Sequence, residues 1–164
     1  MRRVLFDITV VLDFVLDRSP HAAPAALLWA AAERNEIEAF LPAPGITTIF
    51  YLVARHHDQR FARRVMDDLL LVPEIAPVDG PILRRALALG WPDFEDAVCA
   101  AAAEGAGCDA IISRDTKGFL KSPVRVLDPR AALALLREGS GRAGEPTSSF
   151  RRSVKAGKTR AGRR

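Results

Sequence analysis

Short apolar runs alternate with longer segments of helical period along the first 138 residues of the chain. The apolar runs predict five β-strands, at residues 3–6, 37–41, 73–78, 109–113 and 124–127. The segments between them predict helices at residues 9–17, 23–35, 46–57, 60–71, 81–89 and 93–107, and Asp128-Pro129 opens a last helix with a cap and a proline in its first turn. Strands that alternate with helices indicate a parallel sheet with helices on both faces. We therefore predict an α/β fold, a three-layer α/β/α sandwich with a central, mainly parallel five-stranded sheet.

Composition is that of one globular domain with an ordinary core. Of the 164 residues, 49% are hydrophobic and 27% are charged. The longest stretch without a charged residue, from Ala39 to Ala54, is shorter than the ~20 apolar residues of a membrane span. Asp7 and Asp13 interrupt the apolar run near the N-terminus that would otherwise resemble the core of a signal peptide. We therefore expect a cytoplasmic protein that does not associate with a membrane.

Charge is distributed unevenly between two parts of the chain. Residues 139–164 hold eight Lys or Arg and one Glu, a net charge of +7, and since the whole chain carries +4, residues 1–138 carry −3. The C-terminal segment has no apolar periodicity and is rich in Gly, Ser and Arg, which predicts a basic, disordered tail. Such a tail can attract RNA phosphates without sequence preference, or can simply be a solvated appendage. The predicted domain is therefore acidic and spans residues 1–138.

Carboxylates follow or precede the strands that lie at the centre of the predicted sheet. Asp7 ends the first strand, Asp115 follows the fourth by two residues, and Asp93, Glu95 and Asp96 open the helix that leads into the fourth. In a doubly wound sheet of strand order 3-2-1-4-5, the first and fourth strands are neighbours, and ligands bind beyond their carboxyl ends. Three separate segments are therefore expected to bring carboxylates to one edge of the sheet.

Each of these acids also has an ordinary structural explanation. Asp7 could cap a helix that begins near Thr9, the helix dipole favours Glu95 and Asp96 in a first turn, and Asp115 could form an Asx turn. Several carboxylates close together, however, repel one another unless a cation binds among them. Because oxygen ligands suit Mg²⁺ or Mn²⁺, the cluster as a whole indicates a site for one of these ions.

Three segments of the chain resemble a known family: "VLFDITVVLDF", "DFEDAVCAAAAEGAGCDAIISRDTKGF" and "VRVLDPRAAL". In this order and at these separations they are similar to PIN domains, in particular the ribonuclease toxins of bacterial VapBC-type toxin-antitoxin pairs, over about residues 3–137. The resemblance implies a metal-dependent hydrolase that holds Mg²⁺ or Mn²⁺ and cleaves RNA. It assigns Asp7, Asp96 and Asp115 as metal ligands and catalytic acids.

The resemblance also implies roles for other residues around the three acids. Thr9 is expected to contact water or phosphate at the metal, and Glu95 to be an auxiliary ligand or to orient water. Asp93 is a further auxiliary acid, and Arg114 and Lys117 are expected to meet the RNA backbone. The implied partners are RNA, a cognate antitoxin protein and a second copy of the chain. The residues of the third helix from Ile49 to Leu52 could form a partner surface, although burial in the core is the default for apolar side chains.

The chain departs from the family pattern at three places. Ile8 stands where members usually have a polar residue, and Gly118 stands where an acid often follows the fourth strand. The third helix normally contributes a glutamate, whereas "ITTIFYL" offers only Thr47 or Thr48, so that Thr48 is an auxiliary candidate and Glu95 a substitute.

Two alternatives to a nuclease follow from these departures and from the first motif. With one ligand missing, the domain could be a catalytically degenerate PIN-like module that binds RNA or a protein partner. The segment "LFDITVVLD" also resembles the start of haloacid-dehalogenase-type phosphatases, but Thr9 stands where those enzymes have an acid/base aspartate.

Overall fold

The computed structural model describes residues 1–140. The last helix, α7 (Pro129–Ser140), continues to the end of this range, slightly past the domain boundary expected at residue 138. The predicted disorder of the basic tail falls on residues that lie, from 141 onward, outside the described part of the chain.

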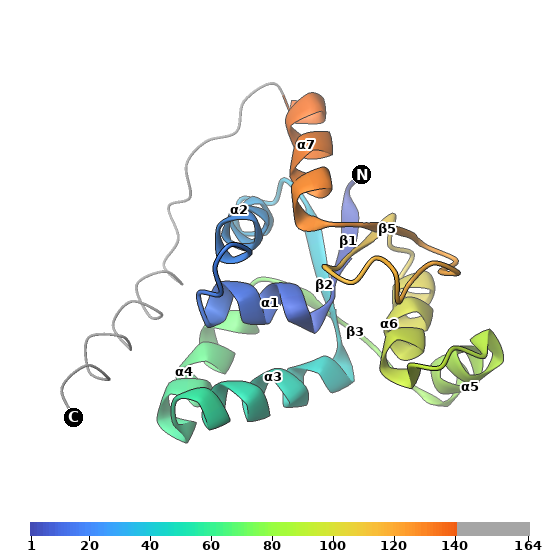
Figure 1. The fold of residues 1–164 in the computed structure, drawn as a ribbon, viewed down its shortest axis with the longest axis horizontal. Coiled ribbons are helices and arrows are strands. Elements are labelled where there is room, and N and C mark those ends of the chain that lie inside the picture. The colour runs from blue at the N-terminus through green and yellow to red at the C-terminus, as the bar shows by residue number, and fades with distance from the viewer. Residues whose placement is uncertain (141–164) are drawn as a thin grey trace.

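Five parallel strands form a single central sheet (Figure 1). Their order is β3-β2-β1-β4-β5, with these bounds: β1 Arg3–Phe6, β2 Glu38–Pro42, β3 Glu74–Ala76, β4 Ala110–Ile112 and β5 Arg125–Leu127. In the register of β1 against β4, Phe6 pairs with Ile112, so both strands end at the same level. The predicted fold class and strand order are confirmed. Asp7 and Ser113, the residues directly after β1 and β4, therefore lie side by side.

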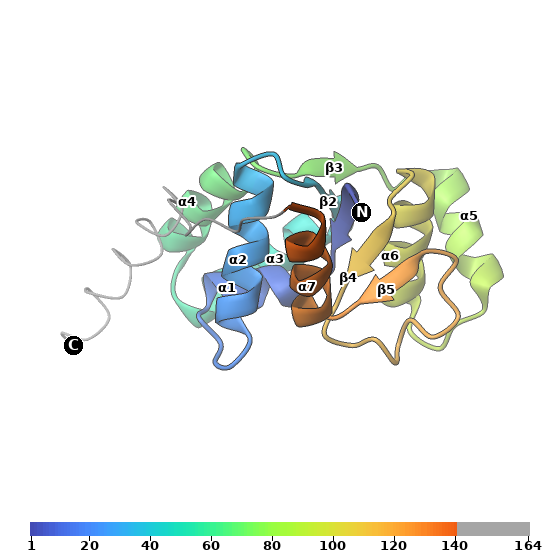
Figure 2. The same ribbon diagram turned by 90° about the horizontal axis from the view of Figure 1, so that it is seen from above.

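Six more helices join α7 in two layers that enclose the sheet (Figure 2). They are α1 Ile8–Val15, α2 Ala22–Glu33, α3 Ala43–His56, α4 Gln59–Leu69, α5 Gly80–Leu89 and α6 Phe94–Gly105. Helices α1, α2, α3, α4 and α7 cover one face, and α5 and α6 cover the other. Successive strand residues point to opposite faces: Val4 and Phe6 enter the larger core, whereas Leu5 enters the core beside α6.

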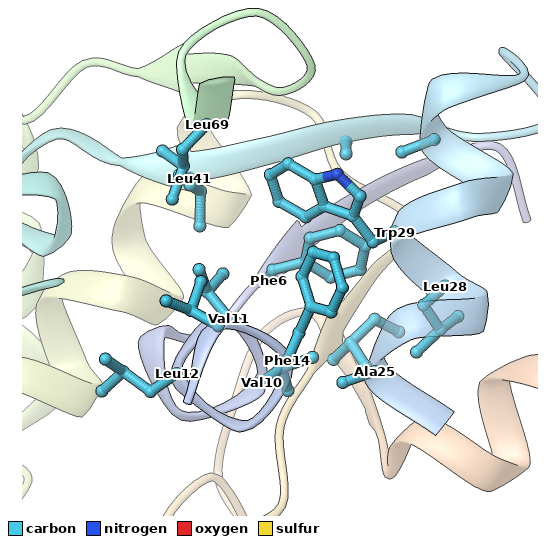
Figure 3. Packing of buried hydrophobic residues seen from close by; sticks show 14 of the residues in the cluster. Phe6, Val10, Val11, Leu12, Phe14, Ala25, Leu28, Trp29, Leu41 and Leu69 are labelled. Atoms are coloured by element: carbon cyan, nitrogen blue, oxygen red, sulfur yellow. The ribbon is translucent and has the colours of Figure 1, made fainter. Parts of the chain in front are cut away.

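Aromatic side chains fill the centre of the larger core (Figure 3). The ring of Trp29 on α2 lies 5.6 Å from that of Phe14 on α1 and 6.5 Å from that of Phe6 on β1, measured between centroids. Trp29 is only 2% exposed, so these contacts join two helices to the central strand. Phe6 directly precedes Asp7, so this packing holds the end of the strand from which Asp7 follows.

Helix α3 begins at Ala43, earlier than the predicted start at residue 46. Pro44 lies in the first turn, where its missing N–H costs no hydrogen bond and its fixed φ suits the helix. A Cβ on Gly45 would come within 2.7 Å of Ile8 Cγ2, so glycine allows α3 to lie close against α1. The Pro-Gly stretch, which precedes the helix predicted at residues 46–57, is thus its first turn.

None of the helices in residues 1–140 is both long enough and apolar enough to cross a membrane.

Candidate functional site

A pocket of about 190 Å³ lies beyond the carboxyl ends of β1 and β4, between the starts of α1, α3 and α6. Six of the residues predicted from the sequence as site residues line it, namely Asp7, Thr9, Asp93, Glu95, Asp96 and Asp115. They come from three segments far apart in the chain, and the parallel sheet with its connecting helices brings them to one place. The structure therefore brings the carboxylates together at the edge of the sheet where the sequence predicts them.

Asp7 lies at the N-cap position of α1, but its side chain caps no backbone N–H. Instead, its Oδ2 accepts hydrogen bonds from Thr9 Oγ and Ser113 Oγ, each with an oxygen–oxygen distance of 2.6 Å. The side chain is nearly buried, with 8% of the residue exposed. Two hydroxyls therefore hold one carboxylate oxygen and fix its direction, which argues against simple helix capping as the reason for an aspartate here.

Ser113 is a site residue that the sequence reasoning missed, because it was assigned to the end of a strand. It is fully buried, and its Oγ both donates to Asp7 and accepts a hydrogen bond from the amide of Asp115 at 3.1 Å. Ser113 thus links the acid after β1 to the acid after β4. The signal in the sequence was a small hydroxyl residue directly after a buried strand, next to the strand that ends on Asp7.

Asp93, one of the acids expected to open this helix, is the N-cap of α6. Its Oδ1 accepts hydrogen bonds from the amides of Glu95 at 2.9 Å and Asp96 at 3.2 Å. This cap holds the first turn of the helix and so places Glu95 and Asp96 at the pocket. Asp93 has a complete structural role there, while Glu95 is exposed beside it.

Asp115 and Asp96 approach each other across Gly118. The Asp115 carboxylate is held by the amide of Gly118, which donates to Oδ1 at 3.0 Å. A Cβ on Gly118 would lie 2.5 Å from Asp96 Oδ2 and 3.2 Å from Asp115 Oδ2, so any larger residue would displace these oxygens. The glycine, a departure from the family pattern, leaves the space between the two carboxylates open.

Negative charge accumulates in the pocket, and its clearest effect is on Asp96. Burial, together with the charges of Asp93, Asp7, Asp115 and Glu95 in decreasing order, raises the pKa of Asp96 to about 6. Every one of these causes disfavours the ionised carboxylate. A cation bound among these acids would reverse the effect, since it attracts all of them.

The raised pKa of Asp96 predicts a pH-dependent loss of stability in the absence of metal. The folded protein holds the Asp96 proton more tightly than the unfolded chain, whose pKa is near the ordinary 3.8. The resulting stabilisation is therefore complete below about pH 4 and is lost as the pH rises through about 6. Because Asp96 is half-buried and partly screened by solvent, we expect a change of ~1–2 kcal/mol in the free energy of unfolding.

Urea unfolding in a metal chelator, followed by circular dichroism across this pH range, measures the effect. Asp96→Asn should be more stable than the parent above about pH 6 and should lose this advantage over the parent as the pH falls below it. Asp67→Asn, at an exposed aspartate on α4, is the control for a simple change of net charge. A parent-minus-variant difference that stays constant with pH would contradict the prediction.

The donor set suits a hard divalent cation. Carboxylate oxygens from Asp7, Asp96 and Asp115 surround the pocket with uncompensated negative charge, and oxygen-only sites favour Mg²⁺ or Mn²⁺. Within residues 1–140, no group of three or more His, Cys, Asp or Glu side chains is already arranged as a metal site. The three residues fit such an ion by chemistry and by location in one pocket.

Part of the pocket lining is apolar, which the sequence did not indicate. It is formed by Ile8, Pro42, Pro44, Gly45, Val98 and Cys99. Cys99 is buried, and burial together with the charges of Asp7, Asp96 and Glu95 holds the pKa of its thiol well above the ordinary value. This thiol is therefore neutral and contributes packing rather than charge.

Three predicted site residues, the auxiliary Thr48 and the RNA-binding Lys117 and Arg114, lie outside the pocket lining. Thr48 is half-buried on α3, and its hydroxyl lies 3.5 Å from the carbonyl oxygen of Pro44, whereas Thr47 donates to the same oxygen at 2.8 Å. Lys117 is exposed beside the site, and its contact with RNA stays a prediction.

Arg114, the third of them, lies with its Nε 2.9 Å from Oδ2 of Asp13 on α1. Asp13 is fully buried, and neither of its carboxylate oxygens accepts a well-aligned hydrogen bond within residues 1–140. Burial raises the pKa of Asp13, and Arg114 offsets part of that rise. The guanidinium expected to meet RNA is thus engaged in an ion pair with a buried carboxylate.

Comparison with known proteins gives one family and several similar structures. A family model of the PIN domain matches residues 3–117. No curated protein matches the chain in sequence.

Among solved structures, the fold is similar to that of VapBC2 from Rickettsia felis bound to a DNA fragment from their promoter, at 11% identity and a TM-score of 0.61, covering 77% of this chain and 98% of that one. FitAcB from Neisseria gonorrhoeae is 20% identical with a TM-score of 0.60, covering 77% and 98%. VapC20 from Mycobacterium tuberculosis, a sarcin-ricin loop cleaving toxin, is 15% identical with a TM-score of 0.60, covering 72% and 94%. At these identities the likeness shows the fold.

Proposed function

The chain belongs to the PIN domain family, whose members are nucleases, and on this premise we propose that it is a metal-dependent endoribonuclease that hydrolyses RNA phosphodiester bonds. In this proposal Asp7, Asp96 and Asp115 hold Mg²⁺ or Mn²⁺. The observation that supports it most directly is the pocket in which these three acids gather, with the pKa of Asp96 raised to about 6 by burial and by its acidic neighbours.

In phosphodiester hydrolysis the metal ion and the protein have different roles. A bound divalent ion neutralises charge on the scissile phosphate and lowers the pKa of a water molecule. The protein's part is to hold its ligands in place, and hydrogen bonds to Asp7 from Thr9 and Ser113 do this before any substrate arrives. The amide of Gly118 orients Asp115 in the same way. Glu95, exposed at the rim, is in a position to orient water.

The absence of an acid from helix α3 is the feature that separates an active nuclease from a degenerate binding module. Its sequence contains no Asp or Glu, and the residues it contributes to the pocket are Pro44 and Gly45. Thr48 lies four residues after Pro44 and three after Gly45, so it lies on the same face of the helix, whereas Thr47 is turned away by about 100°. Position 48 is therefore the place from which a carboxylate would complete the cluster.

Thr48→Glu is expected to lower the concentration of Mn²⁺ needed for half-maximal RNA cleavage by about tenfold or more. One added negative charge near the ion is worth about 1–4 kcal/mol with screening between that of water and that of a protein surface, and ~1.4 kcal/mol is a factor of ten. The measurement is cleavage of a mixed RNA pool by the parent and Thr48→Glu over micromolar to millimolar Mn²⁺ and Mg²⁺.

The matched control is Thr47→Glu, which adds the same charge on another face of the same helix. If the parent is inert at every metal concentration while Thr48→Glu cleaves, the natural protein is a binding module built on a nuclease fold. If Thr47→Glu and Thr48→Glu behave alike, the added charge acts at long range and the placement of position 48 is wrong.

A phosphatase of the haloacid-dehalogenase type finds no support. The residue two positions after Asp7 would have to be the acid/base aspartate, and here it is Thr9, which donates its hydroxyl hydrogen to Asp7.

We also propose that the protein is the toxin of a toxin-antitoxin pair, acting in the cytoplasm, with a protein antitoxin and a second copy of itself as partners. The similar structures include a VapBC2 complex and a toxin-antitoxin complex from Klebsiella pneumoniae, which is 21% identical with a TM-score of 0.59. On α3, Ile49 is fully buried, while Tyr51 is 60% exposed and so is available to a partner. Of the partner surface expected at Ile49–Leu52, we therefore propose that the exposed side of the helix, which bears Tyr51, contacts the partner.

A further inference from the structure

We propose that the ion pair between the buried Asp13 and the partly exposed Arg114 positions the carboxylates of the acidic pocket. It ties the segment after β4, which bears Ser113 and Asp115, to helix α1, which begins directly after Asp7. Asp13 and Arg114 would then be positioning residues, acting through the carboxylates that they help to place. The inference rests on the proposed function for its effect on metal binding, while the effect on the segment itself can be measured independently.

The two partners of this ion pair differ in burial. The Asp13 side chain is 1% exposed and that of Arg114 is 33% exposed, with Nε 2.9 Å from Oδ2. Asp13 belongs to α1, whose residues from Val10 to Val15 are all buried, so its carboxylate points into the protein. The arginine stem comes from the exposed segment and reaches inward to meet it.

A buried ion pair is a poor way to gain stability. Removing two charges from water costs free energy that their attraction offsets only in part, and apolar residues of similar volume are often as stabilising or more so. What the pair does supply is geometry, because a lone buried carboxylate favours the one arrangement that brings the guanidinium to it. Other cations near Asp13 are Arg18 and His21, and both come from the turn after α1. Of these three basic residues, only Arg114 belongs to the segment after β4, and so only Arg114 connects that segment to α1.

Two consecutive residues of that segment are held by the same helix. Ser113 donates to Asp7 at 2.6 Å, and the next residue, Arg114, pairs with Asp13 at 2.9 Å. The residue after these is Asp115, whose amide donates to Ser113 Oγ at 3.1 Å. Asp7 is the N-cap of α1 and Asp13 lies in its last turn. The two aspartates therefore bind the segment at two separate points of the helix. Asp115 therefore follows directly from a doubly anchored stretch of backbone.

The experiment compares the parent with Arg114→Gln, Arg114→Lys and the double variant Asp13→Asn/Arg114→Gln. Hydrogen exchange of the peptide covering residues 113–120, without metal, reports the order of the segment. The Mn²⁺ concentration that gives half of the maximal rise in melting temperature reports the site. Arg85→Gln is the matched control, because it breaks an exposed ion pair with Glu104 at 2.7 Å between α5 and α6.

We expect faster exchange in residues 113–120 and an about 10-fold higher half-saturating Mn²⁺ concentration for Arg114→Gln, the usual range for losing a residue that orients a ligand. The double variant leaves no unpaired buried charge and so regains stability, yet it should keep both defects. Arg114→Lys should recover part of each, and Arg85→Gln should change neither.

A double variant with the exchange and Mn²⁺ response of the parent would overturn the proposal, since a device that can be removed without effect positions nothing. Faster exchange with an unchanged Mn²⁺ response in a parent that responds would overturn it too. If the parent shows no response to Mn²⁺ at all, the metal-dependent function fails, and exchange at residues 113–120 then decides alone whether the pair orders the segment.

Discussion

Asp7→Asn is expected to abolish the Mn²⁺-dependent rise in melting temperature and to lower RNA cleavage by a factor on the order of 10²–10³, the loss typical of removing one element of charge stabilisation. Asp7 is the most buried acid of the pocket, and two hydroxyls already fix one of its oxygens. An amide has the same shape but no negative charge, so it loses the electrostatic attraction for the cation that the carboxylate supplies. The fold should survive, because the hydroxyls of Thr9 and Ser113 can rotate to suit either atom of the amide.

The measurement pairs melting curves over a metal series with cleavage of a mixed RNA pool. Asp79→Asn is the control, since Asp79 caps α5 outside the pocket, with Oδ1 accepting from the amide of Ile82 at 3.0 Å, and asparagine caps equally well. Equal cleavage by Asp7→Asn and the parent would mean that the activity comes from a contaminant and that the assigned site is wrong.

Trp29→Ala should lower the free energy of unfolding by ~3–5 kcal/mol, which is a large share of the stability of a domain of this size. The indole is 2% exposed and contacts the rings of Phe6 and Phe14, so its removal leaves a cavity between α1, α2 and β1. Relaxation around the cavity should be limited, because Phe6 is held in the centre of a parallel sheet. Urea unfolding followed by circular dichroism gives the change.

Two variants make this stability result specific. Trp29→Phe keeps an aromatic ring in the cavity and should cost less than the alanine substitution. Tyr51→Ala removes an aromatic ring that is 60% exposed on α3 and should change stability by only ~0.5 kcal/mol. Similar losses for Trp29→Ala and Tyr51→Ala would show that the aromatic cluster is not the structural centre that its burial indicates.

The secondary structure followed from local patterns wherever those patterns had one physical meaning. Apolar runs gave the five strands because a parallel sheet covered on both faces needs strands without a polar side. The cap Asp128 was recognisable because a carboxylate accepts from free amides in a first turn, and here it accepts from those of Arg130 and Ala131. The start of α3 was predicted too late, because Pro44 and Gly45 also suit a turn, and only the approach of Gly45 to Ile8 shows why they begin a helix.

By itself, the sequence indicated that Asp7, Asp96 and Asp115 would meet. Asp7 and Asp115 follow neighbouring parallel strands, whose carboxyl ends lie at one edge of a sheet, and Asp96 opens the helix that leads from that edge back into the fourth strand. Only the tertiary structure decided what surrounds them. The hydroxyl of Ser113 meets Asp7 across 106 positions of the chain, and Arg114 meets Asp13, whose buried charge had no visible reason along the sequence. Such contacts depend on side-chain direction and on distances of a few ångströms between segments, and local patterns specify neither. The acids of the pocket were therefore predictable, while the residues that hold them in place were not.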